Sequence, residues 1–251
     1  MEFYFLLALN IIFGVMPSLI WLSYYLAKDL HPEPKRMILE VFLFGMLATL
    51  PALLLQIILS GLLREAQVAF PLLAANVWLV DIIRWFIIIA LTEELSKYLV
   101  VRLAILKNPA LDEPLDLMLY MVVGALGFAA LENMLYLLAP VAAAASLNDV
   151  LRAAALVSFI RFVGATFLHT LCAALVGYFM ALSSLRTHKR WRLTIFGLTL
   201  ATLLHGLYNF SIIKLPEPWS YAVPAGIIFF LVVFMVYDFD DIKKVKSICK
   251  L

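Results

Sequence analysis

Charged residues are scarce in this sequence of 251 residues, where they make up 14% of the chain against 65% for hydrophobic residues. Soluble domains typically contain about 25% charged and about 45–50% apolar residues. So little charge excludes a water-soluble globular protein, because the polar side chains are too few to cover its surface. We therefore expect lipid to surround most of the chain.

Cysteine and basic clusters are also lacking. The two cysteines, Cys172 and Cys249, have neither a disulfide nor a CxxC setting, so we expect no disulfide framework and no redox site. The formal net charge of +2 and the absence of a long basic run argue against nucleic acid as a partner. The start, Met1-Glu2, lacks the basic residues of a signal peptide, so we expect the first apolar segment to be a retained spanning helix.

Seven apolar segments are long enough to cross a bilayer, which takes about 20 residues. Short polar or proline-containing breaks separate them, and no internal repeat or soluble domain interrupts them. The pattern predicts an all-α fold, a polytopic integral membrane helical bundle of about seven transmembrane helices in a single membrane domain, residues 1–251. The predicted spans lie near residues 3–27, 37–60, 77–101, 115–139, 152–184, 191–213 and 219–238.

Lysine and arginine are concentrated in alternate loops, and basic loops of membrane proteins tend to stay in the cytoplasm. One set of loops holds only Arg64, Arg152 and Lys214. We therefore expect a multi-pass protein of the cell membrane with its N-terminus outside and its C-terminus cytoplasmic. The basic residues of the other loops and the tail are Lys28, Lys35, Arg36, Arg102, Lys107, Arg186, Lys189, Arg190, Arg192, Lys243, Lys244, Lys246 and Lys250.

Several ionisable side chains lie inside the third predicted span, where each is costly unless it is paired or hydrated. Asp81 and Arg84 are three residues apart near the outer end of the span, which predicts a structural ion pair. Glu93 and Glu94 are different, because Lys97 can neutralise only one of two adjacent carboxylates well. We expect the other carboxylate to face a water pocket and to act as a general base.

A polar stripe marks the fourth predicted span. Phe128, Glu132 and Tyr136 recur every four residues, beside Asn133, so they share one face of a helix. The fifth span carries His169, eight residues after Arg161, and the sixth carries His205 and Asn209 at i,i+4. At about 1.5 Å per residue, Glu94, Glu132, His169 and His205 all lie roughly 20–25 Å from the cytoplasmic side. Four groups at one depth predict a single site just outward of the midplane.

In these motifs the chain resembles the PrsW protease family, which shares a superfamily with the CAAX prenyl endopeptidases. The matching motifs are Glu93-Glu94-Leu95-Ser96-Lys97 (EExxK), Phe128 to Tyr136 (FxxxENxxY), His169, and the pair His205 and Asn209. The resemblance covers about residues 28–213, and it implies hydrolysis of a peptide bond in or near the membrane, typically in a membrane-anchored anti-sigma factor. The CAAX relatives carry histidine where this chain has Glu132, which argues against a prenylated substrate.

Together these features predict an intramembrane endopeptidase in which a glutamate activates water, with a membrane-anchored protein as its partner. No cofactor is favoured, although zinc is an alternative, with Glu93, Glu132, His169 and His205 as its ligands, since zinc accepts nitrogen and oxygen ligands. A proton- or ion-coupled transporter is a further alternative, but such proteins commonly show paired repeats and interrupted helices that this sequence lacks. The candidate catalytic residues are Glu93, Glu94, Glu132, His169, His205 and Asn209. The candidate supporting residues are Lys97, Phe128, Asn133, Tyr136 and Arg161.

Overall fold

The computed structural model describes residues 2–29, 31–106, 108, 111, 113–142, 146–184 and 190–243. All regular structure in these residues is helical, and six of their helices are long and apolar enough to cross a membrane. The expected all-α, polytopic membrane bundle is thereby confirmed. Its helices are α1 (Glu2–Leu26), α2 (Lys35–Ala69), α3 (Pro71–Ala75), α4 (Val77–Ile82), η1 (Ile83–Leu91), α5 (Thr92–Ala104), α6 (Pro114–Ala142), α7 (Leu147–Val163), α8 (Ala165–Ser184), α9 (Arg190–Lys214) and α10 (Trp219–Lys243).

The predicted span 77–101 is helical but changes type along its length. After α4 the chain follows the π-helix η1 for nine residues and returns to an α-helix at Thr92. A π-helix pairs residues i and i+5 and occurs frequently at functional sites. In this chain the change of helix type directly precedes the two adjacent glutamates, Glu93 and Glu94.

The predicted span 152–184 comprises two helices, α7 and α8, which meet at Gly164. A Cβ atom at this glycine would lie 2.6 Å from the hydroxyl oxygen of Tyr208, so the junction has no room for a side chain. The second predicted span is longer than expected, because α2 continues through 61–69. At about 1.5 Å per residue α2 is roughly 52 Å long, more than the hydrocarbon core of about 30 Å.

The expected ion pair between Asp81 and Arg84 is wrong. Asp81 is buried and pairs instead with Lys214 at the end of α9, at 2.8 Å. Arg84 lies in η1 with its side chain exposed. Since the backbone follows a π-helix from Ile83 onward, the spacing of three residues no longer brings these side chains together as it would in an α-helix.

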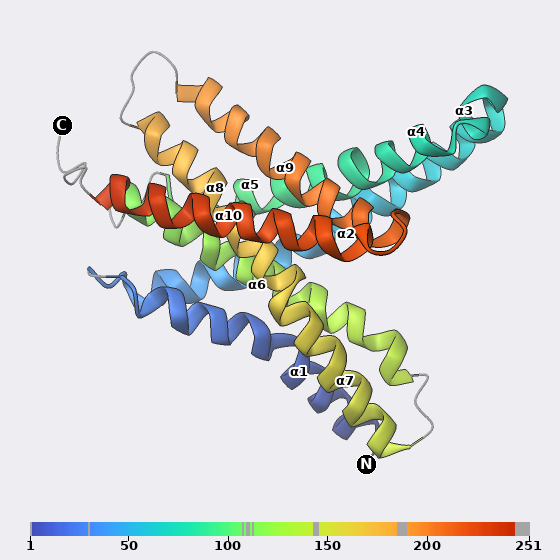
Figure 1. The fold of residues 1–251 in the computed structure, drawn as a ribbon. Coiled ribbons are helices and arrows are strands. Elements are labelled where there is room, and N and C mark those ends of the chain that lie inside the picture. The colour runs from blue at the N-terminus through green and yellow to red at the C-terminus, as the bar shows by residue number, and fades with distance from the viewer. Residues whose placement is uncertain are drawn as a thin grey trace.

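The helix ends sort into two groups at opposite ends of the molecule (Figure 1). One end holds the C-terminal ends of α1, α5, α8 and α10 with the N-terminal ends of α2, α6 and α9. The other end holds α3, the N-terminal ends of α1, α7 and α10, and the C-terminal ends of α6 and α9. This is the alternation expected from the loop charges. Six of the basic residues counted for orientation lie outside the described residues: Lys107, Arg186, Lys189, Lys244, Lys246 and Lys250.

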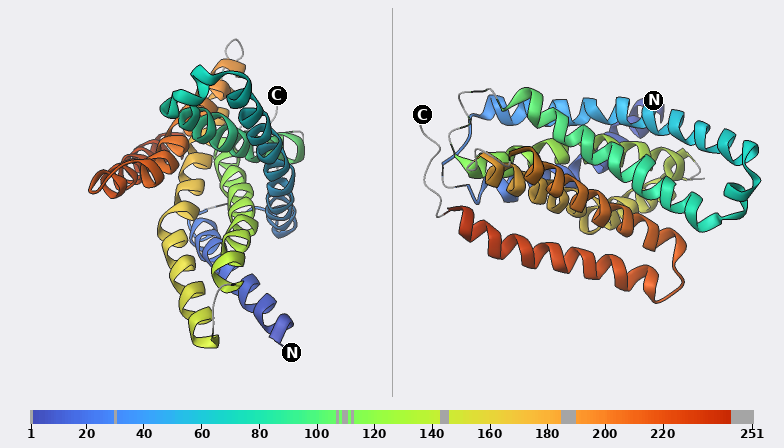
Figure 2. Two further views of the ribbon diagram at one scale, coloured as in Figure 1. Left: turned by 90° about the vertical axis from the view of Figure 1, so that its right-hand side faces the viewer. Right: turned by 90° about the horizontal axis from the view of Figure 1, so that it is seen from above.

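Helix α6 is the centre of the bundle, packed against α1, α2 and α8. Glycines allow its backbone to approach α2 directly, because a Cβ atom at Gly127 would overlap the carbonyl oxygen of Phe42, and one at Gly45 would overlap that of Gly124. Toward the N-terminal end the helices diverge, with α1, α7 and the second half of α6 on one side and α2 to α4 on the other (Figures 1 and 2). The polar residues of the spans lie near the point of divergence.

Candidate active site

The predicted polar residues come together from five helices. Helix α5 carries Glu93, Glu94 and Lys97, and α6 carries Glu132 and the stripe around it. The remaining residues come from α7, α8 and α9: Arg161, His169, His205 and Asn209. The convergence follows from the alternating direction of the helices, which delivers residues far apart in sequence to one depth.

Lys97 and Glu94 form a fully buried ion pair. The Lys97 Nζ atom lies 2.6 Å from Glu94 Oε1, and both side chains have no exposed surface. The same ammonium group lies 2.7 Å from His169 Nδ1 and 5.2 Å from the centre of the Phe128 ring. The charge of Glu94 is therefore compensated within its own helix, as a buried charge requires.

A second buried pair joins α6 to α7 and α8. Glu132 Oε2 accepts hydrogen bonds from Arg161 at 2.7 Å and from His169 Nε2 at 2.9 Å. Arg161 also donates to the side chain of Asn133 and lies 4.0 Å from the ring centre of Tyr136. Of the supporting residues of the α6 motif, Asn133 and Tyr136 thus contact the arginine that pairs with Glu132.

Glu93 has different surroundings from its neighbour Glu94. Its Oε1 atom accepts a hydrogen bond from Gln56 of α2 at 3.1 Å, while its Oε2 atom is buried and has no hydrogen-bond partner in the described part of the chain. The nearest basic group to Oε2 is His205 Nε2, at 3.7 Å. Glu94 Oε2 is likewise buried without a partner among the described residues, so what distinguishes Glu93 is its contact with α2 in place of an ion pair with Lys97.

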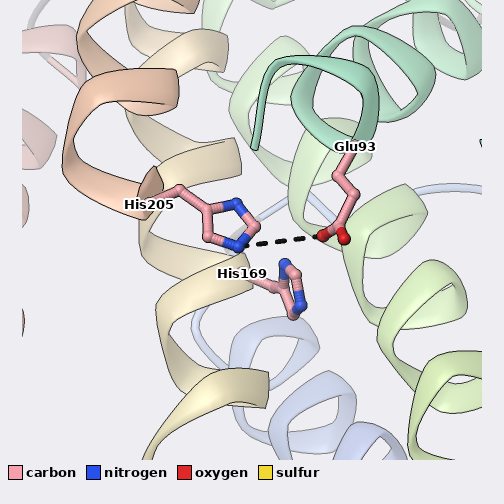
Figure 3. Close-up of side chains that lie close together, drawn as sticks. All are labelled: Glu93, His169 and His205. Carbon is pink, nitrogen blue, oxygen red and sulfur yellow. Dashed lines mark ion pairs between the residues drawn. The ribbon is translucent and has the colours of Figure 1, made fainter. Parts of the chain in front are cut away.

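His205 stands between the two glutamates. Its Nδ1 atom lies 2.7 Å from Glu94 Oε1, and its Nε2 atom faces Glu93. The ring packs edge-on against His169, with 5.1 Å between ring centres. Figure 3 shows Glu93, His169 and His205 pointing toward one another from three different helices.

A cleft of about 560 Å³ opens beside these groups. Its polar lining includes Glu93, Glu132, His169, His205 and Asn209. Glu94 and Lys97 do not line it. The rest of the wall is mostly apolar and comes from α2, η1, α6, α7, α8 and α9: Thr49, Leu53, Trp85, Ile89, Phe128, Leu135, Tyr136, Ala139, Ile160, Ala165, Leu168, Tyr208, Ile212 and Ile213, with Gln56 and Arg161 as further polar members.

Gln56 and Trp85 are two of the cleft residues that were not predicted from the sequence. Gln56 donates to Glu93, and the indole Nε1 of Trp85 is buried without an acceptor among the described residues. A single amide within the apolar run from Leu53 to Ile58 was a usable signal, since polar side chains in a span need a partner. Trp85 gave no signal, because its position on the cleft depends on the π-helix.

The donor set can be tested against a metal. Glu93, His169 and His205 each place a ligand atom within 4.8 Å of the others, and two histidines with one glutamate are a known catalytic zinc set. However, Lys97 can only donate to His169 Nδ1, so the ring proton is assigned to Nε2, where it is donated to Glu132. Both nitrogens of His169 are engaged, so a metal bound by Glu93, His169 and His205 together would require His169 to release Lys97 or Glu132.

Comparison with known proteins identifies relatives over most of the chain. The profile of a family described as "PrsW family intramembrane metalloprotease" matches residues 33–237. A protein named Protease PrsW from Geobacillus kaustophilus is 32% identical over 209 residues, which cover 83% of this chain and 81% of the relative. Proteins of the same name from Bacillus subtilis and Clostridioides difficile are 25% and 26% identical, covering 94% and 92% of this chain and 94% and 89% of their own lengths. No solved structure matches this chain.

Proposed function

Since this chain belongs to the PrsW family of intramembrane proteases, we propose that it hydrolyses a peptide bond of a membrane-anchored protein with water activated by Glu93. The family resemblance read from the EExxK, FxxxENxxY and histidine motifs is confirmed. The relatives named above are all proteases, so the transporter alternative finds no support. The glutamate-based mechanism, the kind of substrate and the side of cleavage are the proposal.

The observation that carries the proposal is the unpaired Oε2 atom of Glu93 at the cleft. Glu94 is bonded to Lys97 and His205, and Glu132 to Arg161 and His169. Two glutamate oxygens are buried without a partner among the described residues, Glu93 Oε2 and Glu94 Oε2, and of these two glutamates only Glu93 lines the cleft. A general base needs a free acceptor within hydrogen-bond reach of the water whose proton it takes.

In the proposed reaction a water molecule between Glu93 and the substrate attacks the peptide carbonyl carbon, and its proton passes to Glu93. The carbonyl oxygen becomes an oxyanion, which accepts hydrogen bonds from the side chains of Asn209 and His205, both of which line the cleft. Collapse of the tetrahedral intermediate breaks the C–N bond, and Glu93 returns the proton to the leaving nitrogen. Oxyanion donors typically contribute about 3–4 kcal/mol each.

The other polar residues hold these groups in place. Lys97 compensates Glu94, which in turn accepts from His205 Nδ1, so His205 is oriented by a buried ion pair. Glu132 and Lys97 hold His169 by its two nitrogens beside the cleft, where its ring limits the space open to the water. Hydrogen bonds from such neighbouring residues fix the side-chain rotamers that catalysis requires.

The substrate is a membrane-anchored protein, as in the anti-sigma-factor cleavage that the family resemblance implies. The apolar wall of the cleft supports this proposal, because a segment that leaves the lipid must be received by apolar side chains. The loop charges support an orientation with the C-terminus in the cytoplasm. In that orientation the site lies in the outward half of the membrane.

Cleavage by purified protein in lipid vesicles tests the proposal. Membrane proteins of the host are reconstituted with either wild-type protein or the Glu93→Gln variant, and new protein termini are identified by mass spectrometry. We expect termini that appear only with the wild type. Identical sets of termini from the two proteins would contradict the assignment of Glu93.

A strong chelator separates the glutamate mechanism from a zinc mechanism. We expect unchanged cleavage in chelator and no zinc in stoichiometric amount in the active protein. Loss of cleavage in chelator with recovery on zinc addition would establish the metal alternative. Glu93 and His205 would then be ligands, and His169 would have to leave Lys97 or Glu132.

A further inference from the structure

Gln56 lies on α2, where it lines the cleft beside the carboxylate of Glu93, and it belongs to none of the recognised motifs. Resting on the proposed function, we propose that Gln56 is the positioning residue for Glu93. Its amide holds one carboxylate oxygen and thereby turns the other toward the water. Gln56 thereby orients the base from α2, a helix outside those that carry the motifs.

The hydrogen bonds of the Gln56 amide have only one consistent direction. Its Nε2 atom lies 3.1 Å from Glu93 Oε1 and 3.2 Å from Thr92 Oγ1. The Thr92 hydroxyl already donates its hydrogen to the carbonyl oxygen of Ile88 at 2.6 Å, so its oxygen must accept. The carboxylate of Glu93 can also only accept. The two amide hydrogens of Gln56 therefore have two acceptors, and no exchange of the amide nitrogen and oxygen satisfies both contacts.

These contacts determine which oxygen of Glu93 is free. With Oε1 held by Gln56, Oε2 is the atom without a partner, and it faces His205 Nε2 at 3.7 Å. Without the amide, the carboxylate could rotate, since nothing else among the described residues bonds to Oε1. A base that rotates meets the water in a productive geometry for a smaller part of the time, which lowers turnover.

The position of Gln56 in its helix agrees with a specific role. Its neighbours Leu54, Leu55, Ile57 and Ile58 are exposed apolar side chains on a helix long enough to cross the membrane. An amide in such a run costs free energy unless its hydrogen bonds are made. Here one amide hydrogen is bonded to the base and the other to its neighbour Thr92. About two turns earlier, α2 is held against α6 by the Thr49 hydroxyl, which donates to the Phe128 carbonyl at 3.2 Å.

The test measures kcat and KM on a spanning segment found cleaved in the vesicle experiment. Gln56→Met keeps the length of the side chain and removes the donor. We expect kcat to fall about 10- to 100-fold, the usual value of a hydrogen bond to a charged group, with KM changed less than about twofold. Leu54→Met, at an exposed position on the same helix, is the control with wild-type kcat.

Thr92→Val separates positioning from a structural role. It removes the other acceptor of the Gln56 amide and leaves the bond to Glu93 in place, so we expect a loss of kcat several-fold smaller than that of Gln56→Met. Equal losses in the two variants would overturn the proposal, because the effect would then come from the end of η1. A Gln56→Met variant with wild-type kcat would also overturn it, and the function of Glu93 would stand. Absence of cleavage by the wild type would overturn the proposed function and this inference together.

Discussion

At the scale of single residues, the two adjacent glutamates of α5 have opposite environments. Glu94 is bonded to Lys97 and His205, whereas Glu93 keeps an unpaired oxygen at the cleft. The sequence predicted this division, since one lysine cannot compensate both carboxylates. It did not predict which glutamate is compensated, because i,i+3 and i,i+4 partners are both within reach of Lys97 on a helix.

The division predicts different phenotypes for the two glutamates. Glu93→Gln should fold normally and lose kcat by about 10²- to 10⁴-fold, the usual contribution of a general base. Glu94→Gln should lose activity and also stability, because it leaves the buried ammonium of Lys97 without its counter-charge. Unfolding temperature in detergent, measured with kcat, checks both. Equal stability losses in the two variants would contradict the assignment.

Lys97 provides a second prediction at this scale. Lys97→Met removes the ammonium group that pairs with Glu94 inside the bundle, and breaking a buried pair typically costs about 3–5 kcal/mol. We expect low expression and no activity. Lys97→Arg keeps the charge and should retain more of both. The yield of folded protein by gel filtration compares the variants, and a well-expressed, active methionine variant would show that Glu94 is hydrated.

At the scale of helices, the apolar periodicity predicted where the chain is helical but not which kind of helix forms. The π-helix η1 lies in a run that is apolar apart from Arg84, Ile83 to Leu91, in which no side chain marks the wider helical turn. The break between α7 and α8 was likewise hidden, because a glycine within an apolar run is common in spanning helices. The Asp81 pairing with Lys214 follows from tertiary packing that local spacing cannot encode.

Close packing of α6 on α2 predicts the effect of added side chains. Gly127→Ala places a Cβ atom on the carbonyl oxygen of Phe42, so the two helices must separate and the catalytic groups of α6 move with them. We expect a lower unfolding temperature and reduced cleavage. Gly226→Ala in α10, where the new atom meets nothing within 4 Å, is the matched control and should be neutral or slightly stabilising. Equal behaviour of the two variants would contradict the packing.

At the scale of the whole molecule, the convergence of the main polar residues could be predicted from the sequence, but the cleft that opens beside them could not. Depth along the helices brought Glu94, Glu132, His169 and His205 to one layer, and in the structure His169 contacts Glu132 and His205 while His205 contacts Glu94. The cleft could not be predicted, since its walls come from seven helical elements and depend on how far these diverge. The position of Trp85 on the cleft could not be predicted for that reason, whereas Gln56 could have been noticed as a single amide in an apolar run.

Orientation and mechanism together predict the products. If the C-terminus is cytoplasmic, Glu93 lies past the middle of the membrane, and water reaches it from outside. The substrate should then be cut in the outward half of its spanning segment. A water-activating base also requires that the new carboxyl terminus carry an oxygen atom from solvent, whichever residue orients the base.

Cleavage in water enriched in ¹⁸O, followed by mass spectrometry of both new termini, tests the central claim most directly. We predict one ¹⁸O atom in the new carboxyl terminus after a single turnover, a cut in the outward half of the spanning segment, and neither product with Glu93→Gln. Unchanged products from Glu93→Gln would contradict the role of Glu93 as the base, and a cut in the cytoplasmic half would contradict the orientation.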